Sequence, residues 1–124
     1  MANMKDIIER RKHRRFQARR GTFAALNNGS LKIGQIQNIS KGGLAFRYIA
    51  NEGQAEGSNN VDIFVTDNHF LLKKIPFTTV SDNRLDLEIP FSTVSLRQCC
   101  GQFGELTQTQ QSELDHFIKG YTVS

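Results

Sequence analysis

The sequence predicts a mainly β protein: an antiparallel barrel or sandwich of roughly six short strands, capped by one C-terminal helix. From Thr22 onward apolar residues recur with a period of two, and small clusters of Gly, Asn, Asp and Ser interrupt them. After Thr107 the apolar residues instead follow the spacing of one helix face. At 124 residues the chain has the usual length of one domain, and it contains no internal repeat. We divide it into a basic arm (1–20), a β region (21–106) and a terminal helix (107–121).

The first half of the β region contains three predicted strands. Residues 22–26 form a short strand, and the following Asn27–Ser30 segment is a strong turn signal. In the next strand, the apolar phase of residues 31–36 shifts at Gly34, which predicts a β-bulge at this glycine. Residues 44–48 alternate as a half-buried strand does.

The second half of the β region begins after a polar loop over residues 50–60. A strand over 61–65 and a long strand over 70–80 are separated by a turn at 67–68, and Pro76 inside the long strand predicts an edge position or a bulge. The polar residues 81–83 predict another turn. The remaining predicted elements are a strand over 85–89 and a final strand region over 91–106, with Gly101 and Gly104 as points of close approach.

The two ends of the chain have different signals. Near the C-terminus the helical face consists of Leu114, Phe117, Ile118 and Tyr121. Thr107 or Thr109 can cap this helix, and Gly120 weakens its end. Near the N-terminus, residues 3–13 could form a short helix, but they contain too few apolar residues to hold it, so we expect a partly mobile arm.

Charge is concentrated in that arm. The chain has a net charge of +4, and residues 1–20, with eight basic and two acidic residues, carry +6 of it, which leaves −2 for the rest. A basic arm on a nearly neutral body indicates an anionic partner for the arm.

Several classes of function find no support in the sequence. Cys99 and Cys100 are adjacent, which fits neither a disulfide framework nor a metal site, and on a strand they would face opposite sides. The three histidines, His13, His69 and His116, are scattered, so we expect no metal and no cofactor. No nucleophile–base pair or carboxylate pair has usable spacing, which argues against an enzyme. No secretory signal and no apolar run near the ~18 residues of a membrane span is present, so we expect a cytoplasmic protein.

The chemically informative feature is a small-residue turn, Asn38–Gly43, together with the arginine cluster of residues 10–15. Arginine binds phosphate oxygens or the guanine edge in a bidentate manner and can stack on bases. Asn38 offers a donor and an acceptor, and the Ser40 hydroxyl can serve as either. Gly42 and Gly43 allow positive φ and close approach. This combination suits a compact dianion with a planar base, which predicts a nucleotide-binding module.

The two motifs resemble those of the PilZ domain, the bacterial receptor module for cyclic di-GMP. Arg11–Arg15 fits its RxxxR motif, and Asn38–Gly43 fits its [D/N]xSxxG motif in full. The ending Gly101–Leu106 followed by a helix is also similar to the family pattern. This resemblance implies a six-stranded β-barrel with a C-terminal helix, a cyclic di-GMP site on the outer surface, and a flexible arginine arm that folds over the ligand.

The resemblance also implies roles for individual residues. Arg11 and Arg15 would form the clamp, Asn38 and Ser40 would hydrogen-bond the ligand, and the glycine at 43 would permit its close approach. Arg10, just before RxxxR, would serve binding of a second, intercalated ligand molecule. Arg10 and Arg14 form an alternative RxxxR one residue earlier, and the sequence leaves this register open. The protein would then be a non-enzymatic receptor or adaptor that acts on an unidentified downstream protein.

Two alternatives compete with this interpretation. One is a nucleic-acid-binding barrel of the OB kind that uses the basic arm on phosphates. The phenylalanines argue against an OB-like barrel, because their alternation along the strands assigns them to the core and not to a base-stacking surface. These residues are Phe46, Phe64, Phe70, Phe77, Phe91, Phe103 and Phe117. The other alternative is a PilZ-like protein-interaction module without ligand binding, against which the intact motifs argue.

Overall fold

The structure is a computed structural model, and it describes residues 14–27, 31–49, 59–66, 70–85 and 96–123. Five sequence predictions fall wholly or mostly outside these ranges. They concern the short helix over 3–13, the turn over 27–30, the loop over 50–60, the turn at 67–68 and the strand over 85–89.

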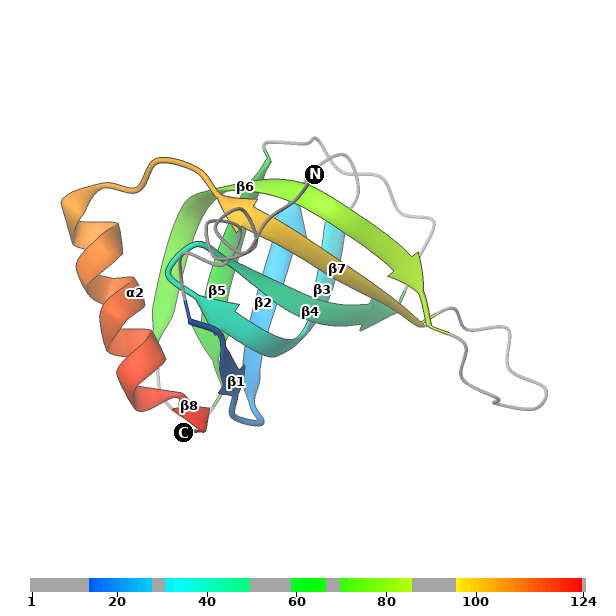
Figure 1. The fold of residues 1–124 in the computed structure, drawn as a ribbon, viewed down its shortest axis with the longest axis horizontal. Helices are drawn as coiled ribbons and strands as arrows, with labels where there is room; N and C mark the ends of the chain where they lie inside the picture. The colour runs from blue at the N-terminus through cyan, green and yellow to red at the C-terminus, as the bar shows by residue number, and fades with distance from the viewer. Residues whose placement is uncertain (1–13, 28–30, 50–58, 67–69, 86–95, 124) are drawn as a thin grey trace, which may run out of the picture.

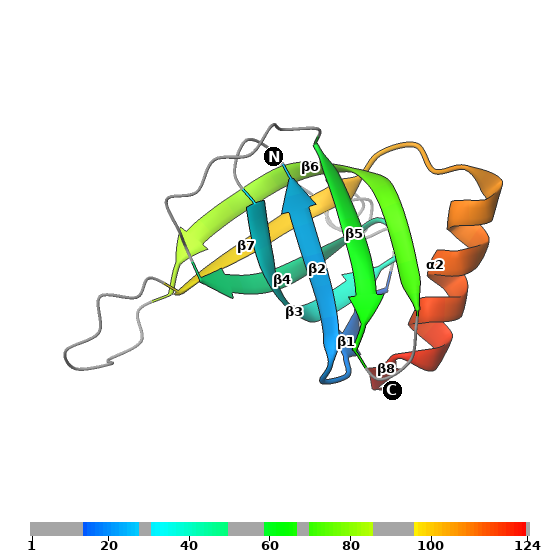
Figure 2. The same cartoon turned by 180° about the vertical axis from the view of Figure 1, so that it is seen from behind.

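The described residues form a closed six-stranded antiparallel β-barrel with one C-terminal helix, which confirms the predicted fold (Figures 1 and 2). The elements are β1 (Phe16–Ala18), β2 (Thr22–Asn27), β3 (Leu31–Ser40), β4 (Gly43–Ile49), β5 (Asn60–Val65), β6 (Leu71–Arg84), β7 (Leu96–Phe103), α2 (Gln108–Gly120) and β8 (Thr122–Val123). The barrel runs β2-β5-β6-β7-β4-β3 and closes through pairing of β2 with β3. The short strands β1 and β8 extend the sheet from β3.

Alternation along the strands fills the barrel with apolar side chains, because every second residue points inward. Phe46, Phe77 and Phe117 are buried as predicted, whereas Phe91 lies outside the described residues. Phe64 is an exception to the predicted core. It is only half-buried and stacks on Phe23 of β2, with ring centroids 5.6 Å apart, on the outer side of the barrel.

The predicted bulge in β3 exists but lies at another residue. Pairing with β4 shifts register between Ile36 and Asn38, so the additional residue is Gln37 and not Gly34. Gly34 is a glycine for a different reason: a Cβ atom there would overlap the carbonyl oxygen of Arg47 on β4. The apolar residues of β3 do change sides along the strand. Leu31 and Ile33, 45% and 49% exposed, face outward, whereas Ile36 faces the core.

Pro76 lies in the barrel wall and not at an edge, because β6 pairs with β5 on one side and β7 on the other. The alternative prediction is a bulge at Pro76, and a bulge does lie nearby, at residues 73–74 of β6. Register with β5 shifts opposite Asp62, and Lys74 has a left-handed backbone with φ of 58°. The Asp62 carboxylate accepts a hydrogen bond from the Lys74 amide at 2.8 Å, which satisfies the amide that the bulge leaves out of the ladder.

The turn predicted at residues 81–83 is wrong, since these residues belong to β6 and pair with β7. Ser, Asp and Asn favour turns because their side chains can bond to nearby backbone. Here the side chain of Asp82 instead finds partners on three other strands, which include Tyr48 on β4 and Arg97 on β7. A bulge between Thr79 and Ser81 precedes it.

Helix α2 begins at the predicted cap. The Thr107 hydroxyl accepts a hydrogen bond from the Gln110 amide at 3.1 Å, and the Gln110 side chain accepts one from the Thr107 amide at 3.0 Å. The same Gln110 side chain donates to the carbonyl oxygens of Lys73 and Lys74, which ties the helix start to the β6 bulge. Leu114, Phe117 and Ile118 are buried, as the helical spacing predicted.

Thr107→Ala should lower the free energy of unfolding by about 1 kcal/mol, because it removes the capping hydroxyl from this reciprocal pair. Urea unfolding followed by circular dichroism measures the change. Thr109→Ala is the matched control: Thr109 is also an exposed threonine at the helix start, but it lies inside the helix and should change stability little. Equal effects of the two substitutions would contradict the assigned cap.

Candidate nucleotide-binding site

The Asn38–Gly43 motif forms the hairpin that joins β3 to β4. Ser40 pairs with Gly43 across a two-residue turn of Lys41 and Gly42. The buried Ser40 hydroxyl accepts a hydrogen bond from the Gly42 amide at 3.1 Å and donates a long one, 3.4 Å, to the Gly43 carbonyl. The Phe103 amide of β7 donates to the Gly42 carbonyl at 2.9 Å. The hairpin tip is therefore held in place, and the serine oxygen keeps one lone pair for a further donor.

The glycines of the motif do not have the positive φ that the sequence allows for them. Neither Gly42 nor Gly43 has positive φ; among the described glycines only Gly21 does. Gly43 is needed because a Cβ atom at this position would overlap the carbonyl oxygen of Gly101 on the neighbouring strand β7. The glycine thus permits close approach of two strands.

Strand β1 brings the end of the arginine arm to this hairpin. Phe16 pairs with Ile39 and Gln17 with Asn38, so one residue further along Arg15 lies beside Ser40. Arg15 and Gln17 are exposed and share the outer side of the strand, whereas Phe16 packs against the core. Within the basic arm assigned to residues 1–20, residues 16–18 are a strand in the sheet. Arg10 and Arg11 lie outside the described residues.

Arg14 has a different position from Arg15. Its guanidinium carbon lies 5.2 Å from the centroid of the Phe16 ring, which indicates a cation–π contact on the side of the strand away from Gln17. The structure therefore distinguishes the two arginines: Arg15 is next to the Ser40 end of the hairpin, and Arg14 covers an aromatic ring.

The strand register extends the outer surface around the motif over four strands. Ser40 lies in one row with Gly43 on β4, Gln102 on β7 and Thr78 on β6. Asn38 lies in the adjacent row, with Ala45, Cys100 and Ser81. The β4 residues of both rows, Gly43 and Ala45, are small; Gly43 is half-buried, whereas Ala45 is buried at 1% exposure.

Gln17 and Gln102 are the residues of this surface that sequence reasoning missed. Both are exposed and directly opposite motif residues, Gln17 opposite Asn38 and Gln102 opposite Gly43. No sequence motif marks them, since their proximity follows from strand register alone. The predicted opposite orientation of the two cysteines is confirmed: Cys99 is fully buried in the core, and Cys100 is on the outer side.

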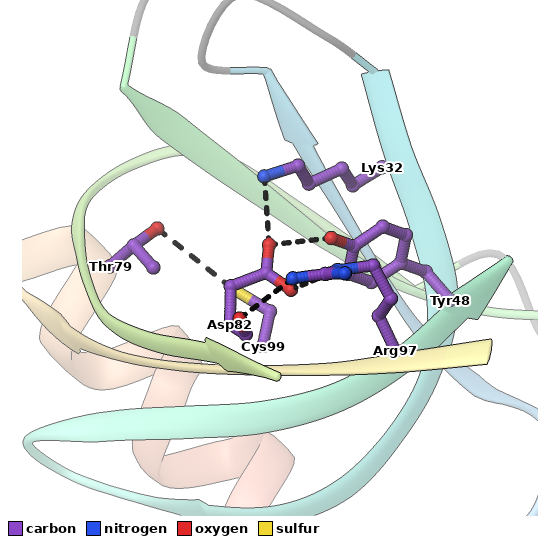
Figure 3. A network of polar contacts seen from close by, with 6 residues as sticks. All are labelled: Lys32, Tyr48, Thr79, Asp82, Arg97 and Cys99. Carbon is purple, nitrogen blue, oxygen red and sulfur yellow. Dashed lines mark hydrogen bonds and ion pairs between the residues drawn. The ribbon is translucent and has the colours of Figure 1, made fainter. Parts of the chain in front are cut away.

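A second polar cluster lies at the other end of β3 and β4 (Figure 3). The Asp82 carboxylate accepts hydrogen bonds from the Tyr48 hydroxyl at 2.5 Å, from Lys32 Nζ at 3.0 Å and from Arg97 Nε at 2.9 Å. Arg97 also donates to the Asp82 backbone carbonyl at 2.8 Å. Four strands of the barrel are thus joined through one carboxylate.

The titration of this cluster fits a structural role. Burial by itself would raise the pKa of Asp82, but the hydrogen bonds from Tyr48, Arg97 and Lys32 outweigh it and lower the pKa. Burial, together with the negative Asp82, raises the pKa of Tyr48, which therefore remains a neutral donor. Burial also raises the pKa of the nearby Cys99 thiol, which disfavours a reactive thiolate. We assign this cluster to stability of the barrel end.

Two kinds of feature are absent from the part of the chain that the structure describes. Within it, no three His, Cys, Asp or Glu side chains gather as a metal site would require. Nor does any helix in the described ranges have the length and apolar character needed to cross a membrane.

Comparison with solved structures identifies the fold. The PilZ domain of YcgR from Escherichia coli, solved with c-di-GMP, superposes with a TM-score of 0.66 at 13% identity, over 90% of this chain and 91% of that chain. MrkH of K. pneumonia in complex with c-di-GMP gives 0.64 at 16% identity, over 88% of this chain and 50% of that one. A second structure of MrkH, described as a c-di-GMP-dependent transcription regulatory factor, gives 0.59 at 15% identity, with 88% and 49% covered.

The chain therefore has a PilZ-like fold, and it spans about half the length of MrkH. No protein-family model matches the sequence, and no curated protein matches it significantly. At the identities above, the structural likeness establishes the fold.

Proposed function

We propose that this protein is a receptor for cyclic di-GMP. The observation that carries the proposal is the pairing of β1 with β3, which sets Arg15 of the arginine motif beside Ser40 of the hairpin motif. Two motifs that are 23 positions apart, counted from Arg15 to Asn38, thus meet on one outer surface. The YcgR PilZ domain and MrkH, which share the fold, were solved with c-di-GMP, and this supports the choice of ligand.

In this proposal Arg11 and Arg15 hold phosphate oxygens or a guanine edge, because the arginine fork matches both in a bidentate manner. Asn38 and Ser40 hydrogen-bond the ligand from β3. Gly42 and Gly43 have no side chains, so the ligand can approach the hairpin backbone closely. Arg10 contacts a second ligand molecule if two bind. The exposed position of Arg15 beside Ser40 favours the Arg11/Arg15 register, since Arg14 covers the Phe16 ring.

The proposed output is a change in surface around α2 and β8. Strand β1 is bonded on its other side to β8, and the Arg19 amide donates to the Tyr121 carbonyl at 2.9 Å. Lys41 in the hairpin turn lies 3.8 Å from Asp115 of α2. The hairpin motif and strand β1 therefore contact the C-terminal elements α2 and β8. In this proposal a downstream protein binds that surface. We propose a non-enzymatic adaptor in the cytoplasm that acts through such a partner.

Calorimetric titration with cyclic di-GMP tests the proposal. Binding should also raise the melting temperature, since a ligand at a hundredfold excess over its Kd stabilises a protein by about 2.7 kcal/mol. Cyclic di-AMP, which has the same backbone and different bases, is the control ligand. Absence of both heat and stabilisation with cyclic di-GMP would refute the receptor. Salt-dependent binding of single-stranded DNA, indifferent to cyclic di-GMP, would favour the nucleic-acid alternative instead.

Gln102→Ala should weaken cyclic di-GMP binding by about 1 kcal/mol, because Gln102 is exposed opposite Gly43 of the hairpin motif and one neutral hydrogen bond contributes about this much. Titration calorimetry measures the loss. Gln108→Ala, an exposed glutamine on α2, is the matched control and should bind as the unmodified protein does. Unchanged binding by Gln102→Ala would mean that the ligand does not reach β7.

A further inference from the structure

The barrel has an apolar outer face that the proposed ligand site does not use. Ile33, Ile49 and Leu31 are 49%, 60% and 45% exposed, which is unusual for large aliphatic side chains gathered on one surface. Phe23 and Phe64 stack on each other next to them. We call Phe23, Ala25, Leu31, Ile33 and Ile49 the β2–β3–β4 face.

Strand register shows that this face is continuous. Ala25 on β2 pairs with Ile33 on β3, and Ile33 lies one residue beyond the Gly34–Tyr48 pair, next to Ile49 on β4. Residues two apart on a strand share a side, so Leu31 and Phe23 belong to the same surface. The Gln37 bulge separates this apolar half of β3 from the half that carries Asn38 and Ser40.

Two opposite charges lie on either side of the face. Asp62 on β5 pairs with Ala25, and Arg47 on β4 pairs with Gln35, which itself pairs with Phe23. Arg47 is exposed, and its Nε donates to Gln98 at 3.1 Å, which leaves its other guanidinium donors unassigned among the described residues. Asp62 uses one carboxylate oxygen for the Lys74 amide. Each charge can therefore accept a further partner.

This arrangement is self-complementary, and we propose that the β2–β3–β4 face is the interface of a homodimer. A two-fold axis lying in the surface, midway between Arg47 and Asp62, passes over the apolar centre of the face. It brings Arg47 of each copy to Asp62 of the other, so the interface contains two reciprocal ion pairs around an apolar centre. A partner of one charge sign would match only one of the two charges, whereas a second copy of this chain matches both.

Light scattering after size-exclusion chromatography of the full chain, without nucleotide and over a dilution series, tests the dimer. The mass should be twice the 14.0 kDa of one chain and should fall to 14.0 kDa in Ile33→Lys and Ile49→Lys, which place a charge in the apolar centre. Val80→Lys is the matched control. Val80 is 64% exposed on β6, separated from β3 by β7 and β4, so this variant should keep the doubled mass.

Charge reversal tests the reciprocal pairing. Arg47→Asp and Asp62→Arg should each shift the dimer towards monomer, and the double variant should recover dimer because the pairs are restored with opposite polarity. A mass of 14.0 kDa for the unmodified chain at every concentration would overturn the proposal. So would dimers that survive both lysine variants, since these would use another surface. Circular dichroism of each variant checks that a monomer is folded.

Discussion

Arg15→Ala should weaken cyclic di-GMP binding at least ten- to hundredfold. Hydrogen bonds to charged groups contribute about 1.5–3 kcal/mol each, and the strand register sets Arg15 next to Ser40, so we expect a phosphate held by Ser40 to lie within reach of its guanidinium. Arg15→Lys should recover little of this affinity, because an ammonium group does not reproduce the bidentate fork. Titration calorimetry measures both variants.

The fold should not change with Arg15, because its side chain is exposed and pairs with no acidic residue within the described ranges. Arg20→Ala is the matched control, since Arg20 is also exposed in the same segment but sits in the turn after β1. Equal weakening by both substitutions would indicate a general effect of positive charge on the arm. Full affinity of Arg15→Ala would contradict the proposed clamp.

Asp82→Ala should lower the free energy of unfolding by about 2–4 kcal/mol, because it leaves Lys32, Arg97 and the Tyr48 hydroxyl without their common acceptor. The side chains of Asp82 and Lys32 are 17% and 18% exposed, which places the loss below that of a fully buried pair. Urea unfolding measures the change. Asp115→Ala is the control. It removes an exposed ion pair with Lys41 and should cost less than about 1 kcal/mol.

The same carboxylate predicts a pH dependence. The folded-state pKa of Asp82 is lowered from its ordinary value of 3.8, so the unfolded chain binds the proton more readily. The stability that Asp82 contributes is therefore present above pH 3.8 and is lost as pH falls through its lower folded-state pKa. Asp82→Asn should flatten this acid part of the stability profile. An unchanged slope in the variant would mean that other carboxylates determine acid unfolding.

The period of two and the helical spacing were sufficient for the barrel and for α2, because both patterns reflect burial directly. Details that depend on strand partners were not predictable in this way. The sequence predicts a bulge at Gly34, but the glycine is there because β4 leaves no room for a side chain. The bulge lies at Gln37. Residues 81–83 have the composition of a turn. They are nevertheless part of β6, because the Asp82 carboxylate binds Lys32, Tyr48 and Arg97 on other strands.

The candidate site divides similarly. The motifs indicated Asn38, Ser40 and Arg15, and the structure brings these to one surface, but the sequence contains no sign of the pairing between β1 and β3 that does so. A three-residue strand within a basic segment has too few apolar residues to show a period. Gln17 and Gln102 were missed for a related reason, since register relates them to the motif across strand boundaries.

Strand β1 is paired on both sides, with β3 and with the two-residue strand β8. Strand β8 is the last strand in the order of the described sheet, and at two residues it is too short to template another chain. A truncation before Thr122 would leave β1 as the last strand, next to Asn38. Loss of Thr122 and Val123 would thus remove one of the two partners of β1 and loosen the strand next to Arg15. A change at β8 would therefore alter the arginine motif.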